Sequence, residues 1–172
     1  YKLPVAPGQT APNMITDVPL RPENKGLWGD NRFRPDEAVL FIGKTPPEVK
    51  YFSYRSYLCN RYFPIEGKVR RIFASLGDTL SNFTINTSGT PDDPFEKETI
   101  IISTADRGID SRIREVLKQT GYSPDIINTD IIPHSLVKMG LKEEDDTFIF
   151  MHRIALFADE AKGEQYLQSN PG

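Results

Sequence analysis

The chain has 172 residues, of which 38% are hydrophobic and 26% are charged, and its formal net charge is -3. Such a composition argues against global disorder and against a partner that is nucleic acid or another polyanion. Its single cysteine, Cys59, excludes an internal disulfide, and its apolar runs are too short to cross about 30 Å of hydrocarbon, so we expect no membrane span.

Residues 1–36 are rich in proline, glycine and asparagine, which interrupt any helical or strand period. We interpret them as an extended N-terminal arm that Trp28 and Phe33 anchor. The chain begins with Tyr1 and shows no signal-peptide pattern, which favours a processed or trimmed chain. Residues 37–172 are expected to form one domain, which is either complete or dependent on a following chain.

From residue 37 the pattern is that of strands. A short buried strand is predicted over 38–43, a long aromatic strand over 49–62, and two further short strands over 70–76 and 81–85. Alternation divides the long strand into a polar face and a face that is apolar at its centre. The polar face holds Tyr51, Ser53, Arg55, Tyr57 and Cys59, and the other holds Phe52, Tyr54, Ser56 and Leu58.

The second half of the chain alternates helices with strands. Residues 98–104 are β-branched, residues 109–117 repeat apolar side chains at helical spacing, and residues 126–132 read as another strand. This strand, helix, strand unit is followed by a helical turn, an acidic run interpreted as a solvated loop, a strand and a short helix. These last four occupy 133–136, 143–146, 147–157 and 159–168. The fold class is therefore α+β, with a β-rich sheet or partly closed barrel.

A motif opens the long strand, and two others follow it in order. They are Pro47-Glu48-Val49-Lys50-Tyr51-Phe52-Ser53, then Ser75-Leu76-Gly77-Asp78, then Pro94-Phe95. Their order resembles secreted or periplasmic bacterial proteins of unknown function in which Pro-x-x-Lys/Arg-Tyr-Phe/Trp-Ser begins a strand. The resemblance covers about a third of the chain. It implies a β-rich, exported protein that continues past Gly172, and it implies no established reaction.

Two glycosylation sequons lie close together in a polar stretch, at Asn82 and Asn86. Because asparagine glycosylation requires a secretory route, this pair favours a secreted or periplasmic glycoprotein.

No cofactor and no metal are expected. The two histidines and the single cysteine match no zinc pattern, and the acidic pairs lack the EF-hand spacing. The loop 104–108 lies between a buried strand and a helix, where helix N-termini favour anions. Two interpretations stay open: Asp106 or Asp110 caps the helix, or Arg107 takes part in a site for an anion.

The polar face of the long strand suggests chemistry. Arg55 lies between Ser53 and Tyr57 and would clamp a carboxylate or carbonyl, unless this is the solvent side of an antiparallel sheet. His152 interrupts the apolar strand 147–157, and histidine titrates near neutral pH, although a lone histidine is usually a core residue. We predict His152 as acid or base, Tyr57 as proton donor and Arg55 as the anchor of an anionic group.

Aromatic side chains are expected to line a pocket around this set: Tyr51, Phe52, Tyr54, Phe148 and Phe150. The favoured hypothesis is an exported small-molecule enzyme with cofactor-independent acid–base chemistry, as a lyase, isomerase or cyclase. The alternative is a non-enzymatic module that binds a small-molecule ligand or a subunit, either as a homo-oligomer or as one chain of a processed heteromer.

Overall fold

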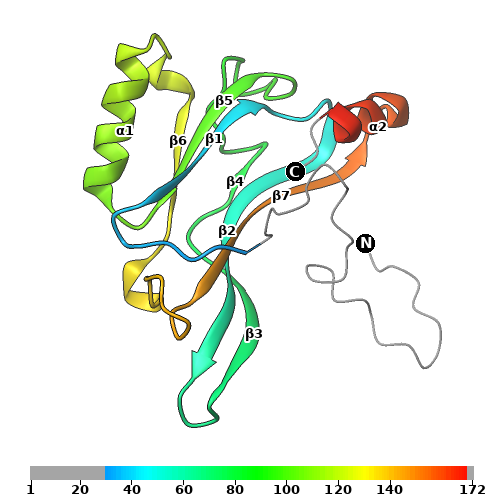
Figure 1. Cartoon of the computed structure of the whole chain (residues 1–172). Coiled ribbons are helices and arrows are strands. Elements are labelled where there is room, and N and C mark those ends of the chain that lie inside the picture. The colour runs from blue at the N-terminus through cyan, green and yellow to red at the C-terminus, as the bar shows by residue number, and fades with distance from the viewer. Residues whose placement is uncertain (1–29, 170–172) are drawn as a thin grey trace, which may run out of the picture.

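The computed structural model describes residues 30–169 and has three layers. A helix covers one sheet, and that sheet packs on a second sheet (Figure 1). The hairpin at the end of the second sheet projects from the body (Figure 1). The α+β class predicted from the sequence is confirmed, whereas the described strands form two separate sheets and no closed barrel.

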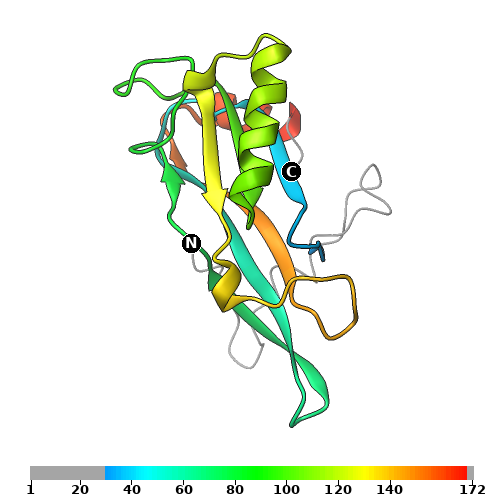
Figure 2. The same cartoon turned by 90° about the vertical axis from the view of Figure 1, so that its left-hand side faces the viewer.

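The first sheet has the strand order β1-β5-β6. Its strands are β1 (Ala38–Lys44), β5 (Glu98–Thr104) and β6 (Ile127–Ile131); β1 is antiparallel to β5 and β6 is parallel to it. The parallel pair is connected by α1 (Arg107–Gln119) and the 3-10 turn η2 (Pro124–Ile126). Figure 2 shows α1 on the side of this sheet that faces away from β2 and β7. The predicted strand, helix, strand unit is therefore present.

The second sheet is built around β2 (Val49–Phe63), which is long enough to pair with three strands. One edge of β2 pairs with β7 (Thr147–Phe157), and the other pairs with β3 (Lys68–Ser75) and β4 (Leu80–Ser81). β4 is shorter than the predicted strand over 81–85 because Thr84 and Ile85 donate to the Ser81 carbonyl in a turn. The 3-10 turn η3 (His134–Leu136) and α2 (Glu160–Ser169) complete the chain.

A bulge at Cys59 changes which face each later residue of β2 occupies. Leu58 pairs with Phe148 and Asn60 pairs with Thr147, so Cys59 has no opposite residue on β7. The strict alternation expected along this strand is therefore correct up to Leu58 and reversed from Asn60 onward. As a result, Arg61 reaches Asp146, whose carboxylate accepts at 2.9 and 2.6 Å.

The core lies between the two sheets and under α1. Phe52 and Tyr54 of β2 are fully buried against Ile101 of β5, and Ile102 packs beneath α1 beside Leu117. Because β5 is central, its residues are buried on both faces, as a run of β-branched side chains predicts.

Three polar oxygens connect the sheets inside this core. Ser56 Oγ lies 2.6 Å from Ser103 Oγ and 2.5 Å from Asp130 Oδ2, and Ser103 Oγ lies 2.8 Å from the same carboxyl oxygen. Both serine hydroxyls donate to Asp130 Oδ2, and burial raises the pKa of Asp130.

Two interpretations from the sequence need correction or delimitation. The acidic run at 143–146 is not wholly solvated, because Asp146 is fully buried and also accepts from the Lys138 amide at 2.8 Å. Residues 1–29 of the proline-rich arm, which include Trp28, lie outside the described residues. The last part of the arm belongs to the body: Asn31 pairs with Phe148, and Phe33 is buried as predicted.

No helix within residues 30–169 is long and apolar enough to cross a membrane.

Candidate functional site

The structure divides the predicted catalytic set between two faces of the second sheet. His152 lies directly opposite Tyr54, so it shares the inner face of β2. Arg55 and Tyr57 lie opposite Met151 and Ile149 and belong to the outer face. Since side chains on opposite faces of a strand cannot converge on one substrate atom, the expected combination of these three residues is not assembled.

His152 is part of the aromatic core. Its ring stacks on Tyr54 at 4.1 Å between centroids, and the rings of Phe52 and Tyr166 meet it edge-on at 6.3 Å. Its Nε2 is buried and has no hydrogen-bond partner among the described residues. Burial lowers the pKa of His152 to about 4, so the ring is neutral at physiological pH.

The expected aromatic pocket is filled by its own side chains. Phe52 and Tyr54 are 0% exposed and Phe148 is 2% exposed. Phe150 packs against the same cluster, with its ring 6.2 Å from that of Tyr54. These residues stabilise the fold and leave no space for a ligand; only Tyr51 of the predicted lining lies on the outer face, at 37% exposure.

The outer face instead gathers arginines and aromatic rings, which we call the arginine–aromatic ladder. The guanidinium of Arg153 lies 5.1 Å from the Tyr57 ring centroid, and Tyr57 stacks on Phe73 at 4.9 Å and 9°. The guanidinium of Arg71 lies 5.8 Å from the Phe73 ring centroid. Phe73 adopts a left-handed backbone with φ of 50°, which is rare for an aromatic residue.

Arg55 lies beside this ladder. It is half-buried, and its Nε is buried without a partner in residues 30–169. Arg153 is exposed, and neither guanidinium forms an ion pair with any side chain that the structure describes. Ser53, opposite Arg153 in the strand pairing, is buried beneath these side chains.

The whole second sheet lacks carboxylates. β2, β3, β4 and β7 contain no Asp and no Glu, although the chain has 24 acidic residues. The same strands carry seven Lys and Arg residues: Lys50, Arg55, Arg61, Lys68, Arg70, Arg71 and Arg153. Arg61 and Arg70 are paired with Asp146 and Glu66 from outside the sheet. The strands of this sheet are thus positively charged within a chain of negative net charge.

The loop that carries Arg107 forms a capped helix terminus. Asp106 Oδ1 accepts from the amides of Gly108 and Ile109 at 2.6 and 3.1 Å, as one of the two interpretations predicts. A carboxylate therefore already occupies the N-terminus of α1, where an anion would bind. Arg107 is exposed and has no place in an assembled site.

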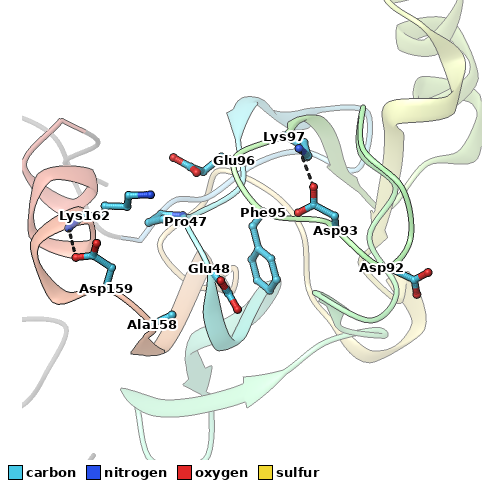
Figure 3. Close-up of a pocket in the computed structure, with 10 residues that line it drawn as sticks. All are labelled: Pro47, Glu48, Asp92, Asp93, Phe95, Glu96, Lys97, Ala158, Asp159 and Lys162. Atoms are coloured by element: carbon cyan, nitrogen blue, oxygen red, sulfur yellow. Dashed lines mark hydrogen bonds and ion pairs between the residues drawn. The ribbon is translucent and has the colours of Figure 1, made fainter.

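A cleft of about 430 Å³ lies at the end of the sandwich; its lining includes no predicted site residue, although its Phe95 ring meets that of Phe52 edge-on at 6.0 Å (Figure 3). The loop 92–97, the start of β2 and the start of α2 line it with five carboxylates and two lysines. Lys97 pairs with Asp93 at 2.9 Å, and Asp159 accepts from the Lys162 amide at 3.1 Å (Figure 3). The carboxylates of Glu48, Asp92 and Glu96 form no ion pair with a described residue, so the cleft is lined mainly by acidic groups.

The remaining candidates are peripheral. Asn86 is exposed, whereas Asn82 is half-buried with its amide oxygen enclosed, so the glycosylation of either residue stays a prediction. Cys59 is buried, which raises the pKa of its thiol. Within residues 30–169, no three His, Cys, Asp or Glu side chains are arranged to hold a metal ion.

Sequence reasoning identified Arg55 and Tyr57 and missed Arg153, Arg71 and Phe73. The absence of acidic residues from these four strands could have been recognised in the sequence. The stacking of Phe73 on Tyr57 could not have been predicted from the sequence, because it depends on pairing between β2 and β3 and on an irregular backbone.

Comparison of this chain with protein-family models, with curated proteins and with solved structures finds no match.

Proposed function

We propose that this chain is a ligand-binding module that holds a small carboxylate- or phosphate-bearing molecule on the outer face of its second sheet. One observation carries this proposal: Arg55 and Arg153 lie on adjacent strands and form no ion pair with a described carboxylate, although Arg55 acts electrostatically on the buried Asp130. A guanidinium removed from water needs hydrogen-bond acceptors, and its planar fork fits two anionic oxygens.

The ladder adds a preference for the body of the ligand. Tyr57 is only 5% exposed and lies under the half-buried Phe73 ring, so Phe73 is the ring that can meet a ligand, and aromatic surfaces favour planar, apolar groups. An anion attached to an aromatic ring therefore suits this face better than a bare inorganic anion. The left-handed backbone at Phe73 agrees with this proposal, because strained residues are common at binding sites.

Binding is tested by calorimetric titration of the full chain with phenyl phosphate, benzoate, inorganic phosphate and acetate. We expect Arg55→Ala and Arg153→Ala each to weaken phenyl phosphate binding by about tenfold or more, which is about 1.4 kcal/mol. Arg107→Ala is the control, because it removes the same charge from α1. Equal affinities in all three variants, or no binding by the wild-type chain, would exclude the proposal.

The role of the rings has its own test. Tyr57→Leu keeps the charge of the face and removes the stacking partner of Phe73. We expect this variant to lose the preference for phenyl phosphate over inorganic phosphate while it retains affinity for inorganic phosphate. An unchanged preference would show that the rings only support the sheet.

An acid–base enzyme is the alternative, and its geometry has less support. His152 is separated from Arg55 and Tyr57 by the thickness of the sheet, and its neutral ring is enclosed by aromatic side chains. A substrate-dependent turnover that His152→Ala abolishes, with folding intact, would favour the enzyme over the binding module.

Export, glycosylation and association with a second chain from one precursor remain predictions that accompany this function. Asn86 is the more accessible acceptor because its side chain is exposed. Mass spectrometry of the protein from its source, with and without glycosidase, measures all three.

A further inference from the structure

We propose that β1 is a dimerisation strand: two copies of this chain join the outer edges of β1 in an antiparallel pair centred on Phe41. The partner is a second copy of the chain, and the contact is separate from the arginine–aromatic ladder. The argument starts from the edge itself. β1 is paired on one side only, with β5, over all seven of its residues.

The unpaired backbone groups of β1 belong to its even-numbered residues. Thr45 donates its amide to the Lys97 carbonyl at 2.9 Å, so the odd-numbered positions in this register direct their amides and carbonyls toward β5. Leu40 and Ile42 then direct theirs outward. Within residues 30–169 the outer edge has one interaction, a contact of 3.4 Å from the Tyr166 hydroxyl to the Lys44 carbonyl.

Exposed apolar side chains accompany this edge. Val39, Leu40 and Ile42 are 37%, 42% and 47% exposed, although all three belong to a regular strand. α1 covers the neighbouring strands, where Ile100 and Ile102 are 1% and 0% exposed. An edge that is both apolar and unpaired is the kind of strand that joins another strand.

The other sheet edges carry features that prevent such pairing. The outer edge of β3 has Lys68, Arg70 and the irregular Phe73, and the Ile127 carbonyl of β6 accepts from Arg114 at 3.1 Å. β7 pairs with Asn31 at one end and is distorted at Leu156, where φ is 61°. β1 has neither a bulge nor a proline, and its one charge is at the terminal Lys44.

The sequence of β1 is complementary to itself in this arrangement. A two-fold axis at Phe41 places Leu40 opposite Ile42 of the partner and Lys44 opposite Ala38 of the partner. Leu40 and Ile42 of both copies then form hydrogen-bonded pairs and one apolar cluster, whereas pairing at Lys44 requires the Tyr166 hydroxyl to leave the Lys44 carbonyl. Asp36 and Glu37, next to this end of the strand, already pair with Arg34, so the apolar pairs and the backbone hydrogen bonds carry the complementarity. Because each copy contributes the same edge to the contact, the assembly is complete as a dimer.

Sedimentation equilibrium of the full chain over a range of concentrations tests the proposal. We expect the mass to rise from 19.5 kDa toward twice that value. Ile42→Lys places two like charges across the axis and should abolish the rise, while Ile65→Lys, at a fully exposed turn position, should leave it unchanged. A monomer at all concentrations would overturn the proposal, and so would larger assemblies that Ile42→Lys abolishes.

Hydrogen exchange identifies the edge independently of any substitution. The outward amides of Leu40 and Ile42 should gain protection as concentration rises, whereas the Phe41 amide, which faces β5, should be protected throughout. A dimer in which the amides of Leu40 and Ile42 exchange as fast as in the monomer would place the interface elsewhere.

Discussion

The two sheets differ in what lies on their outer faces. α1 covers the first sheet, and the cluster under it includes Ile100, Ile102 and Leu117, each at most 5% exposed. The second sheet carries Arg55, Tyr57 and Arg153 on its outer face instead of an apolar cluster. The first face is therefore devoted to stability, whereas the second has charges that its own sheet does not neutralise.

This difference follows from the composition of the central strands. β5 is β-branched and apolar at successive positions, so both of its faces must be covered. β2 alternates Phe52 and Tyr54 with Ser53 and Arg55, so its inner face is apolar and its outer face is polar, although Ser53 and Tyr57 of the outer face are also buried. Arg55 and Arg153 are the groups of this face that remain accessible for binding.

The largest expected effect concerns the cover of the first sheet. Leu117→Ala should lower the free energy of unfolding by about 3 kcal/mol, because it removes a buried side chain and leaves a cavity under α1. Val116→Ala on the same helix, where the side chain is 57% exposed, should cost less than about 0.5 kcal/mol. Urea denaturation measures both, and equal losses would contradict the role given to α1.

The next effect is a pH dependence of the free energy of unfolding that arises in the interior and not on the outer face. The folded state favours neutral His152, whose pKa is lowered to about 4, so stability should fall as the pH drops below 6.5. The loss should reach at most about 3 kcal/mol near pH 4, and His152→Phe should remove it. His134→Phe, at an exposed position, is the control. If both variants keep the wild-type dependence, His152 is not the titrating group.

A smaller effect of opposite sign belongs to the polar contact between the sheets. Burial raises the pKa of Asp130, so the stability contributed by its protonated form should be lost as the pH rises above about 4. Asp130→Asn keeps the shape of the neutral acid and should flatten this slope above about pH 4. Thermal unfolding at several pH values measures it, with exposed Asp125→Asn as the control.

The smallest effect is expected on the outer face of the second sheet. Arg153→Ala removes an exposed side chain and one cation–π contact, so unfolding should become easier by no more than about 1 kcal/mol. The affinity of Arg153→Ala for phenyl phosphate should nevertheless fall by about tenfold or more. A large loss of stability would mean that the ladder is structural, and the contrast between the two outer faces would disappear.

Local patterns of the sequence determined the order and extent of most elements. The strand at 98–104, the helix that follows it and the strand at 147–157 were all predicted close to their observed bounds. Apolar periodicity, Gly121 and the capping Asp106 are local signals, so no tertiary information was required.

The candidate site depended on information that is not local. Arg55 and Tyr57 were identified because both belong to one strand, whereas Arg153 and Phe73 join them only through pairing with β7 and β3. The register of β7 decided that His152 faces Tyr54 in the core, and a shift of one residue would have placed it beside Arg55.

The sequence by itself therefore determined the α+β class, the strand, helix, strand unit and the polar character of one face of β2. Only the tertiary structure decided that the sheets stay separate, that Cys59 forms a bulge, and that His152 and Tyr57 occupy opposite faces. The physical reason is that periodicity depends on neighbours along the chain, whereas register depends on contacts between strands that are far apart in sequence.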